Sequence, residues 1–356
     1  GYLARGQQAA IIGDTNAAAV YLTAAKEAGA SGDVLDIPLG TVGNTLAAEK
    51  MVYQNHQGKV WALALIPGGK QFISAGADGA VNLWNIGSAQ PMHTWKDAQA
   101  GIFMVAVSPD GRYVAVPAWD GHARVYEVAS LKLVHDWVYG TVQADFATFT
   151  QDSQTLIVVD IRGRASVWRL GESSPTWRFE HGDQAVGLPA LSPDGHTFAV
   201  PMRTGEISIW DVKHKRLVRR LSGPHASFAT VASFSQDGSM LAVGGIDATL
   251  SLWKTADWSF AGKLVGHNSG IMYIDWSPKG DQLATGDRSG ELRTWSRKGA
   301  PLGHFKGEDG IVFDIDWHPE QPWLVSAIGN SSIVLDGQSL ATLGRFQSQG
   351  STIFRT

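Results

Sequence analysis

Four histidines recur at equivalent places along the chain, and histidine is the side chain most ready to transfer protons or bind a metal near neutral pH. They are His56, His181, His225 and His267, and each lies 22 or 23 residues before the hairpin position of its repeat. A zinc site needs ligand atoms that converge at about 2.0–2.1 Å. Because each histidine belongs to a different sequence repeat, we interpret all four as structural hydrogen-bond partners and predict no metal and no cofactor.

A second recurring set is acidic and occupies turn positions. Its members are Asp110, Asp152, Asp194 and Asp237. Paired carboxylates would suit acid–base chemistry or calcium, but these residues also fall in separate repeats. Aspartate is favoured in such turns because its side chain bonds nearby backbone N–H groups. The sequence contains no nucleophile elbow and no phosphate loop. We therefore predict no catalytic residues and a protein that is not an enzyme.

The turn clusters recur at an almost constant interval. Their first residues lie 42, 42, 42, 43, 42 and 41 positions apart, and they are Ile66, Ser108, Thr150, Ser192, Ser235, Ser277 and His318. An aromatic ladder keeps the same step, at Trp84, Tyr126, Trp168, Trp210, Trp253 and Trp295. A repeat of about 40–45 residues that contains four short strands is the signature of a β-propeller blade. Radial stacking would bury each sheet between two neighbours. The sequence thus predicts an all-β, seven-bladed propeller.

The repeat resembles that of the WD40 family over roughly residues 50–346. The resemblance implies a buried hydrogen-bonded chain in each blade, made of His, Ser or Thr, Asp and Trp. The first repeat holds the full set, in His56, Ser74, Asp78 and Trp84. In the sixth repeat Ser289 replaces the Asp, and in the fifth Val243 replaces the hydroxyl. The chains are therefore expected to be patchy, although the period is regular.

We expect three segments along the chain. They are an N-terminal helical segment and linker (1–49), the WD40-like propeller (50–346) and a C-terminal tail (347–356). The alanine-rich first part predicts a short α-helical hairpin. Two stretches, residues 50–54 and 339–346, are each able to supply the fourth strand of the last blade. Closure by an N-terminal strand is usual in the family that the repeat resembles, and it favours residues 50–54.

Composition narrows the function. The formal net charge is −4 and the pI is about 6.3, whereas a nucleic-acid-binding domain is usually basic. The absence of cysteine excludes disulfides, thiolate catalysis and covalent c-type haem within this chain. No run of about 20 apolar residues is present, so we predict no membrane span. The missing cysteines and the low charge favour an extracytoplasmic or periplasmic location, with the cytoplasm as the alternative.

Residues beside the hairpin aspartates and before the first strands point toward one face of the predicted propeller. Those with apolar or arginine side chains are Trp119, Ile161, Arg203, Phe228, Ile246, Arg288 and Ile311. Aromatic residues and arginine are enriched in the cores of protein interfaces. The competing interpretation is a scatter of exposed apolar residues without a role. We predict a non-catalytic protein–protein interaction scaffold, a subunit or domain of a larger, bacterial-type assembly.

Two other functions are compatible with the sequence. Residues 350–356 are similar to the helix that leads into the haem-attachment motif of small c-type cytochromes. That similarity suggests an accessory subunit of a cytochrome or membrane electron-transfer complex. The other alternative is an enzyme that uses the central channel, for which a converging polar cluster would be required. The identity of the protein partner stays open.

Overall fold

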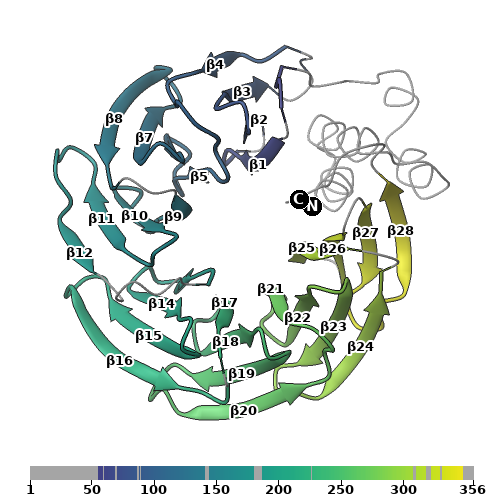
Figure 1. Ribbon diagram of the computed structural model, residues 1–356. Coiled ribbons are helices and arrows are strands. Elements are labelled where there is room, and N and C mark those ends of the chain that lie inside the picture. Colours follow the sequence, from purple (N-terminus) through teal and green to yellow (C-terminus); the bar gives the residue numbers. More distant parts are fainter. Residues whose placement is uncertain are drawn as a thin grey trace. The chain divides into compact units, whose positions relative to one another are not determined.

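The computed structural model describes residues 55–347 except 59, 69, 86, 87, 89, 141–143, 180–186, 226, 308–309, 318–321 and 329–330. The predicted helical segment, residues 1–49, lies outside the described residues, as do His181 and the tail after Gln347. Every element of the described part is a β-strand, and the strands form seven four-stranded antiparallel sheets (Figure 1). The chain is an all-β, seven-bladed propeller, as its repeat predicts. No helix in this described part has the length and apolar character of a membrane span.

Four blades fall in one compact unit, Tyr53–Leu221. Blade one is β1 (Val60–Leu65), β2 (Gln71–Gly76), β3 (Val81–Asn85) and β4 (His93–Trp95). Blade two is β5 (Ala106–Val107), β6 (Tyr113–Pro117), β7 (His122–Glu127) and β8 (Lys132–Val138). Blade three is β9 (Ala144–Phe149), β10 (Thr155–Asp160), β11 (Ala165–Arg169) and β12 (Trp177–Phe179). Blade four is β13 (Ala190–Leu191), β14 (Thr197–Pro201), β15 (Glu206–Asp211) and β16 (Arg216–Ser222).

Three blades fall in the second unit, which includes the chain from Ser222 onward. Blade five is β17 (Ala229–Phe234), β18 (Met240–Gly245), β19 (Thr249–Lys254) and β20 (Phe260–Val265). Blade six is β21 (Ile271–Trp276), β22 (Gln282–Asp287), β23 (Glu291–Ser296) and β24 (Pro301–Lys306). Blade seven is β25 (Val312–Trp317), β26 (Trp323–Ile328), β27 (Ser331–Asp336) and β28 (Thr342–Gln347).

The fourth strand of blade seven comes from the C-terminal side. Strand β28 pairs antiparallel with β27, from Ser331 opposite Gln347 to Leu335 opposite Thr342. The expectation that residues 50–54 would supply this strand is therefore wrong. The physical reason is proximity in sequence: a short turn after Asp336 brings β28 back onto β27, and a short loop costs little closure entropy.

Turn chemistry explains why the strands end where they do. The hairpins between second and third strands place a residue at positive φ, and glycine fills most of these positions because it has no Cβ. Gly79 has φ 70° and Gly290 has φ 82°. Blade five has Ala248 at φ 62° instead. An alanine there costs roughly 1 kcal/mol relative to glycine, since the left-handed region crowds its Cβ.

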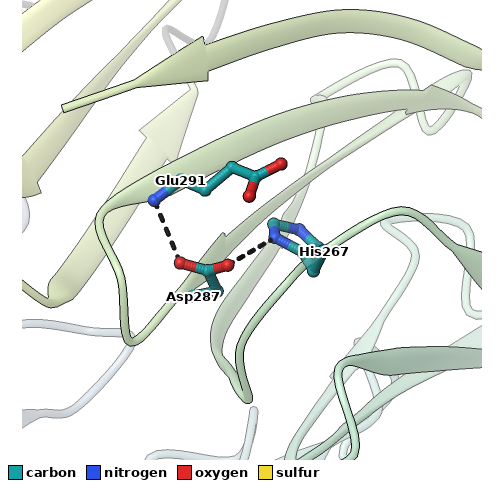
Figure 2. Close-up of side chains that lie close together, drawn as sticks. All are labelled: His267, Asp287 and Glu291. Carbon is teal, nitrogen blue, oxygen red and sulfur yellow. Dashed lines mark hydrogen bonds and ion pairs between the residues drawn. The ribbon is translucent and has the colours of Figure 1, made fainter.

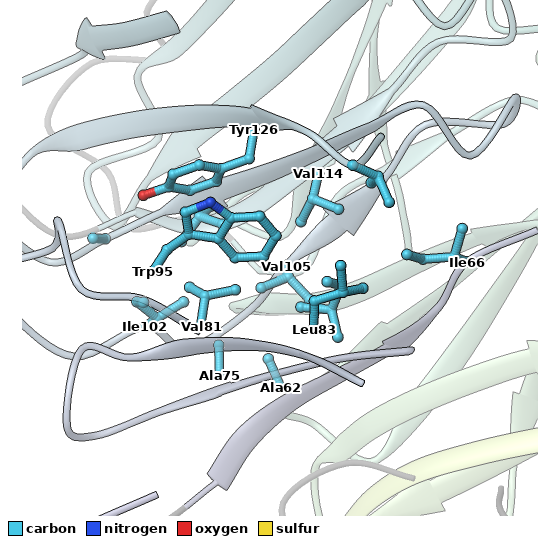
Figure 3. Packing of buried hydrophobic residues seen from close by; sticks show 14 residues of the cluster. Ala62, Ile66, Ala75, Val81, Leu83, Trp95, Ile102, Val105, Val114 and Tyr126 are labelled. Carbon is cyan, nitrogen blue, oxygen red and sulfur yellow. The ribbon is translucent and has the colours of Figure 1, made fainter. Parts of the chain in front are cut away.

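Aromatic side chains join neighbouring blades within the first unit. Trp95 of β4 packs on Tyr126 of β7 with ring centroids 4.8 Å apart, and its Nε1 donates to the Leu131 carbonyl at 3.0 Å (Figure 3). The same contact recurs one blade later, where Trp137 stacks on Trp168 at 4.9 Å. The fourth strand of one blade thus covers the third-strand aromatic residue of the next. Truncating a buried tryptophan of this kind typically costs about 3–5 kcal/mol.

The innermost strands carry a recurring irregularity. In β1 the pairing with β2 skips Trp61, because Val60 lies opposite Gly76 and Ala62 lies opposite Ala75. The same shift occurs in β17, β21 and β25. A bulge inserts one residue into a strand and redirects its side chain. Trp61 is therefore displaced from the regular alternation of its strand.

Candidate functional site

The histidine, serine, aspartate and tryptophan of blade one form one continuous hydrogen-bonded chain. The Trp84 Nε1 donates to Ser74 Oγ at 2.8 Å, and Ser74 Oγ lies 2.8 Å from His56 Nε2. On its other side, His56 Nδ1 lies 3.0 Å from Asp78 Oδ1. Asp78 also accepts from the backbone N–H of Gln57 at 2.8 Å. Both ring nitrogens of His56 are thereby occupied, which leaves this histidine no free atom for a metal or a substrate.

The ionisation of Asp78 is tied to this chain. Burial by itself would raise the pKa of Asp78, but the hydrogen bonds from His56 and from the Gln57 backbone outweigh burial. They hold the pKa of Asp78 below its usual value. The carboxylate is thus stabilised in its charged form, as a hydrogen-bond acceptor and not as a proton donor.

Blade six has a complete chain that the sequence did not reveal. Trp295 Nε1 donates to Thr285 Oγ1 at 2.9 Å, and His267 Nε2 lies 2.7 Å from the same hydroxyl. His267 Nδ1 lies 3.1 Å from Asp287 Oδ2. The expected gap at Ser289 is therefore filled by Asp287, two residues earlier. Burial would raise the pKa of Asp287, but the bonds from His267 and the Glu291 backbone lower it to about 2.

The same place offers the nearest approach to a metal site within the described residues. His267, Asp287 and Glu291 bring their ligand atoms within 4.8 Å of one another (Figure 2). Each of these groups is already engaged, since Glu291 accepts from Arg293 Nε at 2.7 Å and from Asn268 Nδ2 at 3.1 Å. We therefore interpret the cluster as part of the hydrogen-bonded chain.

Blade five also completes its chain by another route. Val243 supplies no hydroxyl, but Ser251 Oγ lies 2.9 Å from His225 Nε2 and accepts from Trp253 Nε1 at 3.0 Å. His225 Nδ1 lies 3.3 Å from Asp247. Ser251 precedes Trp253 by two residues, so both side chains lie on the same face of β19. A hydroxyl from the third strand thus replaces one from the second.

Blades two and three use ion pairs near the equivalent hairpins. Arg124 Nη1 lies 2.9 Å from Asp120 in blade two, and Arg164 Nε lies 2.7 Å from Asp160 in blade three. In blade three the indole Nε1 of Trp168 is buried and has no acceptor among the described residues. Both blades thus hold an aspartate near the hairpin by an arginine side chain, and in blade three Trp168 lies outside any such chain.

The four turn aspartates of the sequence serve their own turns. Asp110 accepts from Ser108 Oγ at 2.6 Å and from the Arg112 backbone at 3.0 Å. Asp237 accepts from Ser235 Oγ at 2.6 Å. The Ser235 hydroxyl is the largest cause that lowers the pKa of Asp237. The structure brings no pair of these aspartates together, so they provide no acid–base site.

Asp275 in β21 and Asp316 in β25 form an acidic pair on two first strands of the second unit, which the sequence analysis did not single out; we call it the inner acidic pair. Asp275 in β21 accepts from the Trp317 backbone N–H at 3.2 Å, and its own carbonyl accepts from Trp317 Nε1 at 3.2 Å. Burial, and next the negative charge of Asp316, raise the pKa of Asp275 well above its usual range. The visible role of Asp275 is to join β21 to β25.

A half-buried aromatic cluster stands out in blades one and two. Its members are Trp61, Phe103 and Trp119, and we call it the aromatic rim cluster. The ring centroids of Trp61 and Trp119 are 5.1 Å apart, and those of Trp61 and Phe103 are 6.3 Å apart. The Trp119 backbone N–H donates to the Gly101 carbonyl at 3.1 Å. A Cβ on Gly101 would lie 2.7 Å from the Trp61 ring, so glycine is what lets that ring lie across the backbone.

Two properties make this cluster a candidate binding surface. Its three rings are each partly exposed, and Val60 beside Trp61 is 39% exposed. The indole Nε1 of Trp119 is buried and lacks an acceptor among the described residues. The sequence analysis singled out Trp119 but not its two aromatic neighbours, and in the structure the Trp119 ring packs on that of Trp61.

The other predicted rim residues divide between the two units. In the first unit, Ile161 is 38% exposed and Arg203 is exposed. In the second unit, the Ile246 N–H donates to the Phe228 carbonyl at 2.9 Å, and the Arg288 N–H donates to the Gly270 carbonyl at 3.0 Å. Ile246 lies against Gly270, where an added Cβ would approach its Cδ1 to 2.6 Å. A backbone hydrogen bond thus joins Ile246 to Phe228, and Ile246 and Arg288 each contact Gly270. Ile311 is half-buried.

The fold and its internal chains define the class: a β-propeller in which histidine, hydroxyl, aspartate and tryptophan are hydrogen-bonded within blades one, five and six. The WD domain, G-beta repeat family (WD40) matches five segments that together exceed half of the chain. They are residues 48–85, 89–127, 215–254, 258–296 and 299–335. The chain belongs to the WD40 family.

Curated relatives match over shorter stretches. The ciliary WD repeat-containing protein ctxp80 of Euplotoides octocarinatus is 34% identical over 102 residues, 27% of this chain and 14% of that protein. Apoptotic protease-activating factor 1 of Rattus norvegicus is 30% identical over 115 residues, 30% of this chain and 9% of that protein. The anaphase-promoting complex subunit cdh1 of Dictyostelium discoideum is 32% identical over 87 residues, 24% of this chain and 11% of that protein.

This chain therefore aligns with less than a fifth of the length of each of these three relatives. All three are eukaryotic proteins, so the bacterial-type assembly stays a prediction. Among solved structures, the computationally designed Ika8 protein has a TM-score of 0.74 and 17% identity, with 84% of this chain and 90% of that chain covered. At that identity the likeness shows the fold alone.

Proposed function

We propose that this propeller is a non-catalytic scaffold that binds a protein partner through the aromatic rim cluster. WD40 propellers generally serve as protein-interaction scaffolds in assemblies. Two of the relatives are named as an apoptotic protease-activating factor and as a subunit of the anaphase-promoting complex. The observation that carries the proposal here is the half-exposed cluster of Trp61, Phe103 and Trp119.

The cluster has the chemistry of an interface anchor. Aromatic side chains bury about 150–250 Å² each and provide large contact area at low entropic cost. Binding energy in protein interfaces concentrates in a few such residues, typically tryptophan, tyrosine and arginine. The rings of Trp61 and Trp119 are held against one another and against Gly101 before any partner arrives. A preorganised anchor loses little side-chain freedom on binding.

The remaining rim residues extend this proposal. Ile161 and Arg203 in the first unit are exposed and suit an acidic or mixed partner. In the other unit we propose Phe228, Ile246 and Arg288 as further contact residues, since Ile246 is bonded to Phe228 and both Ile246 and Arg288 contact Gly270. We also propose an extracytoplasmic location, on the grounds of the missing cysteines and the low charge alone.

The two alternative functions have less support. An enzyme that uses the channel would need converging polar side chains. Among the described inner strands we find the pair Asp275 and Asp316, and Asp275 is already hydrogen-bonded to the Trp317 backbone. For an accessory subunit of a cytochrome complex, the similarity lies in residues 350–356, outside the described residues.

The test is affinity purification of the natural full-length protein, followed by mass spectrometry of the proteins that copurify. A paired purification of the Trp119→Ala, Phe103→Ala double variant should lose the specific partner. The control is Trp258→Ala, because Trp258 lies in the turn between β19 and β20. If the double variant retains the partner and Trp258→Ala loses it, the docking surface is not the aromatic rim cluster.

A further inference from the structure

The outer edge of blade three is fastened to blade two by a histidine and a tryptophan of one strand. His135 and Trp137 lie two residues apart in β8, so both side chains point to the same face of that strand. The indole Nε1 of Trp137 donates to the Glu172 carbonyl at 3.0 Å. The backbone N–H of Gly171 donates to His135 Nε2, also at 3.0 Å. We call these two hydrogen bonds, which hold the turn between β11 and β12 against β8, the β8 latch.

Only the neutral form of His135 can accept the bond from Gly171. A backbone N–H is the donor in this contact, so Nε2 must present its lone pair and the ring proton must lie on Nδ1. A proton added to Nε2 faces the N–H of Gly171 and removes the bond. The ring also stacks on Trp137, with centroids 4.5 Å apart and an angle of 20° between the planes. Stacking survives protonation, because a cation is attracted to the face of an indole. Protonation therefore breaks the Gly171 contact and leaves the ring in place.

The nearest side chains on the His135 face of the sheet are uncharged. His135 lies opposite Val125 of β7, and Trp137 lies opposite Ala123. The next pair on that face consists of the opposite charges Glu127 and Lys132. The charged residues on the other face of these two strands form ion pairs with one another, and they are His122, Arg124 and Asp136. Along β11, β12 and their turn the charged residues are exposed to solvent, and they are Arg169, Glu172 and Arg178. Burial thus dominates, and it lowers the pKa of His135.

Blade one shows the same spacing without the histidine bond. His93 and Trp95 lie two residues apart in β4, and Trp95 Nε1 donates to the Leu131 carbonyl in the turn of blade two at 3.0 Å. The His93 ring contacts the Trp95 ring edge-on at 4.8 Å and has no hydrogen bond to a described residue. The tryptophan bond to the following blade is therefore shared by both junctions. The histidine bond is an addition at the junction of blades two and three.

We propose that the β8 latch is an acid-sensitive device, in which protonation of His135 releases the β11–β12 turn of blade three from blade two. In neutral solution both hydrogen bonds hold the turn, and in mildly acidic solution the Trp137 bond holds it alone. Because the folded-state pKa of His135 lies below 6.5, its ordinary value, the stabilisation is present above 6.5 and is lost as pH falls below it. The latch contains no residue of the aromatic rim cluster, so this proposal and the scaffold function can fail independently.

The experiment follows hydrogen exchange of the Gly171 backbone amide by NMR, in the whole chain labelled at glycine, at about pH 7.5 and about pH 5, on either side of the histidine range. After correction for the intrinsic pH dependence of exchange, the protection of Gly171 should fall roughly fivefold at the lower pH, since one hydrogen bond is lost. His135→Phe keeps a ring against Trp137 but has no acceptor, so its Gly171 should be weakly protected at both pH values. The matched control, His93→Phe in blade one, should behave like the wild-type protein.

Two further readouts in the same samples separate the latch from other effects of acid. The amide of Gly205 in blade four, which donates to the Met202 carbonyl at 3.0 Å, should keep its protection at both pH values. Parallel loss at Gly205 would mean global unfolding and would overturn the proposal. NMR of the histidine ring nitrogens should place the proton of neutral His135 on Nδ1. A proton on Nε2, or a Gly171 protection that neither acid nor His135→Phe reduces, would overturn it equally.

Discussion

The hydrogen-bonded chains of blades one, five and six differ from the aromatic rim cluster in what their side chains do. The chains contain the residues with chemical reactivity, but His56 and His267 use both ring nitrogens in bonds to their own blade. The cluster contains only apolar rings, yet its surface is partly exposed and the Trp119 indole lacks an acceptor among the described residues. The reactive side chains therefore stabilise the fold, and the apolar ones are available for binding.

The largest effect is expected from His267→Ala in blade six. His267 is almost fully buried and bridges Thr285 and Asp287, so its loss removes one hydrogen bond each from a buried hydroxyl and a buried carboxylate. The free energy of unfolding should fall by about 3 kcal/mol. Urea denaturation measures this fall. The control is His122→Ala, whose half-exposed ion pair with Asp136 should contribute less than about 1 kcal/mol. Similar losses for the two variants would contradict the structural role of the chain.

A smaller loss is expected from Asp78→Ala in blade one. Asp78 accepts from His56 and from backbone N–H groups, and removing it should cost about 1–3 kcal/mol. Thr204 holds the equivalent hairpin position in blade four and is exposed, so Thr204→Ala should cost less. Thermal melts that reverse this order would refute the distinction between the two blades.

The inner acidic pair should respond to pH in the opposite sense to the chains. The folded-state pKa of Asp275 is raised, so the folded protein holds its proton above 3.8, the ordinary value, and this group's contribution to stability falls as pH rises through that window. Asp275→Asn should therefore stabilise the protein by about 1–2 kcal/mol at neutral pH and have little effect near pH 4. By contrast, the pKa of Asp287 is about 2, so its contribution is present above its unfolded-state pKa and is lost as pH falls toward 2.

Denaturation of Asp275→Asn at several pH values is the measurement. A destabilised variant at neutral pH would mean that the charged carboxylate is needed for its bond from the Trp317 backbone.

The smallest effect is expected from Ser251→Ala in blade five, at about 1 kcal/mol, because it removes one neutral hydroxyl from the chain. Adding Val243→Ser to this variant returns a hydroxyl to the second-strand position that blade one uses. Partial recovery of stability in the double variant, measured by chemical denaturation, would show that either strand can supply the hydroxyl. Further loss would show that they are not.

The sequence predicts the blades well because the period depends on local turn chemistry. Glycine at positive φ and aspartate in the turns mark each hairpin wherever they occur. The chains are harder to predict, since a hydroxyl or a carboxylate two residues away lies on the same face of a strand and can substitute. Asp287 is such a substitute for Ser289. Ser251 is a substitute of another kind, because it lies opposite Val243 on the neighbouring strand. A search at fixed motif positions passes over both.

The candidate site is harder still to predict. The bulge in β1 displaces Trp61 by one residue from the regular alternation. The Trp61 ring of blade one then contacts the Trp119 ring of blade two. Neither feature has a local signature in the sequence. The closing strand of blade seven shows the same limit, because two stretches had similar strand character and the pairing of β28 with β27 decided between them.

The most direct test of the central claim is calorimetric titration of the copurified partner into the wild-type protein and into Trp119→Ala, with Trp258→Ala as the matched tryptophan control. Truncation of an interface anchor typically costs about 2 kcal/mol or more in binding free energy. We expect at least that loss for Trp119→Ala, with wild-type affinity for Trp258→Ala and a fold that remains intact in both. Unchanged affinity in the Trp119→Ala variant would contradict the assignment of the aromatic rim cluster as the binding surface.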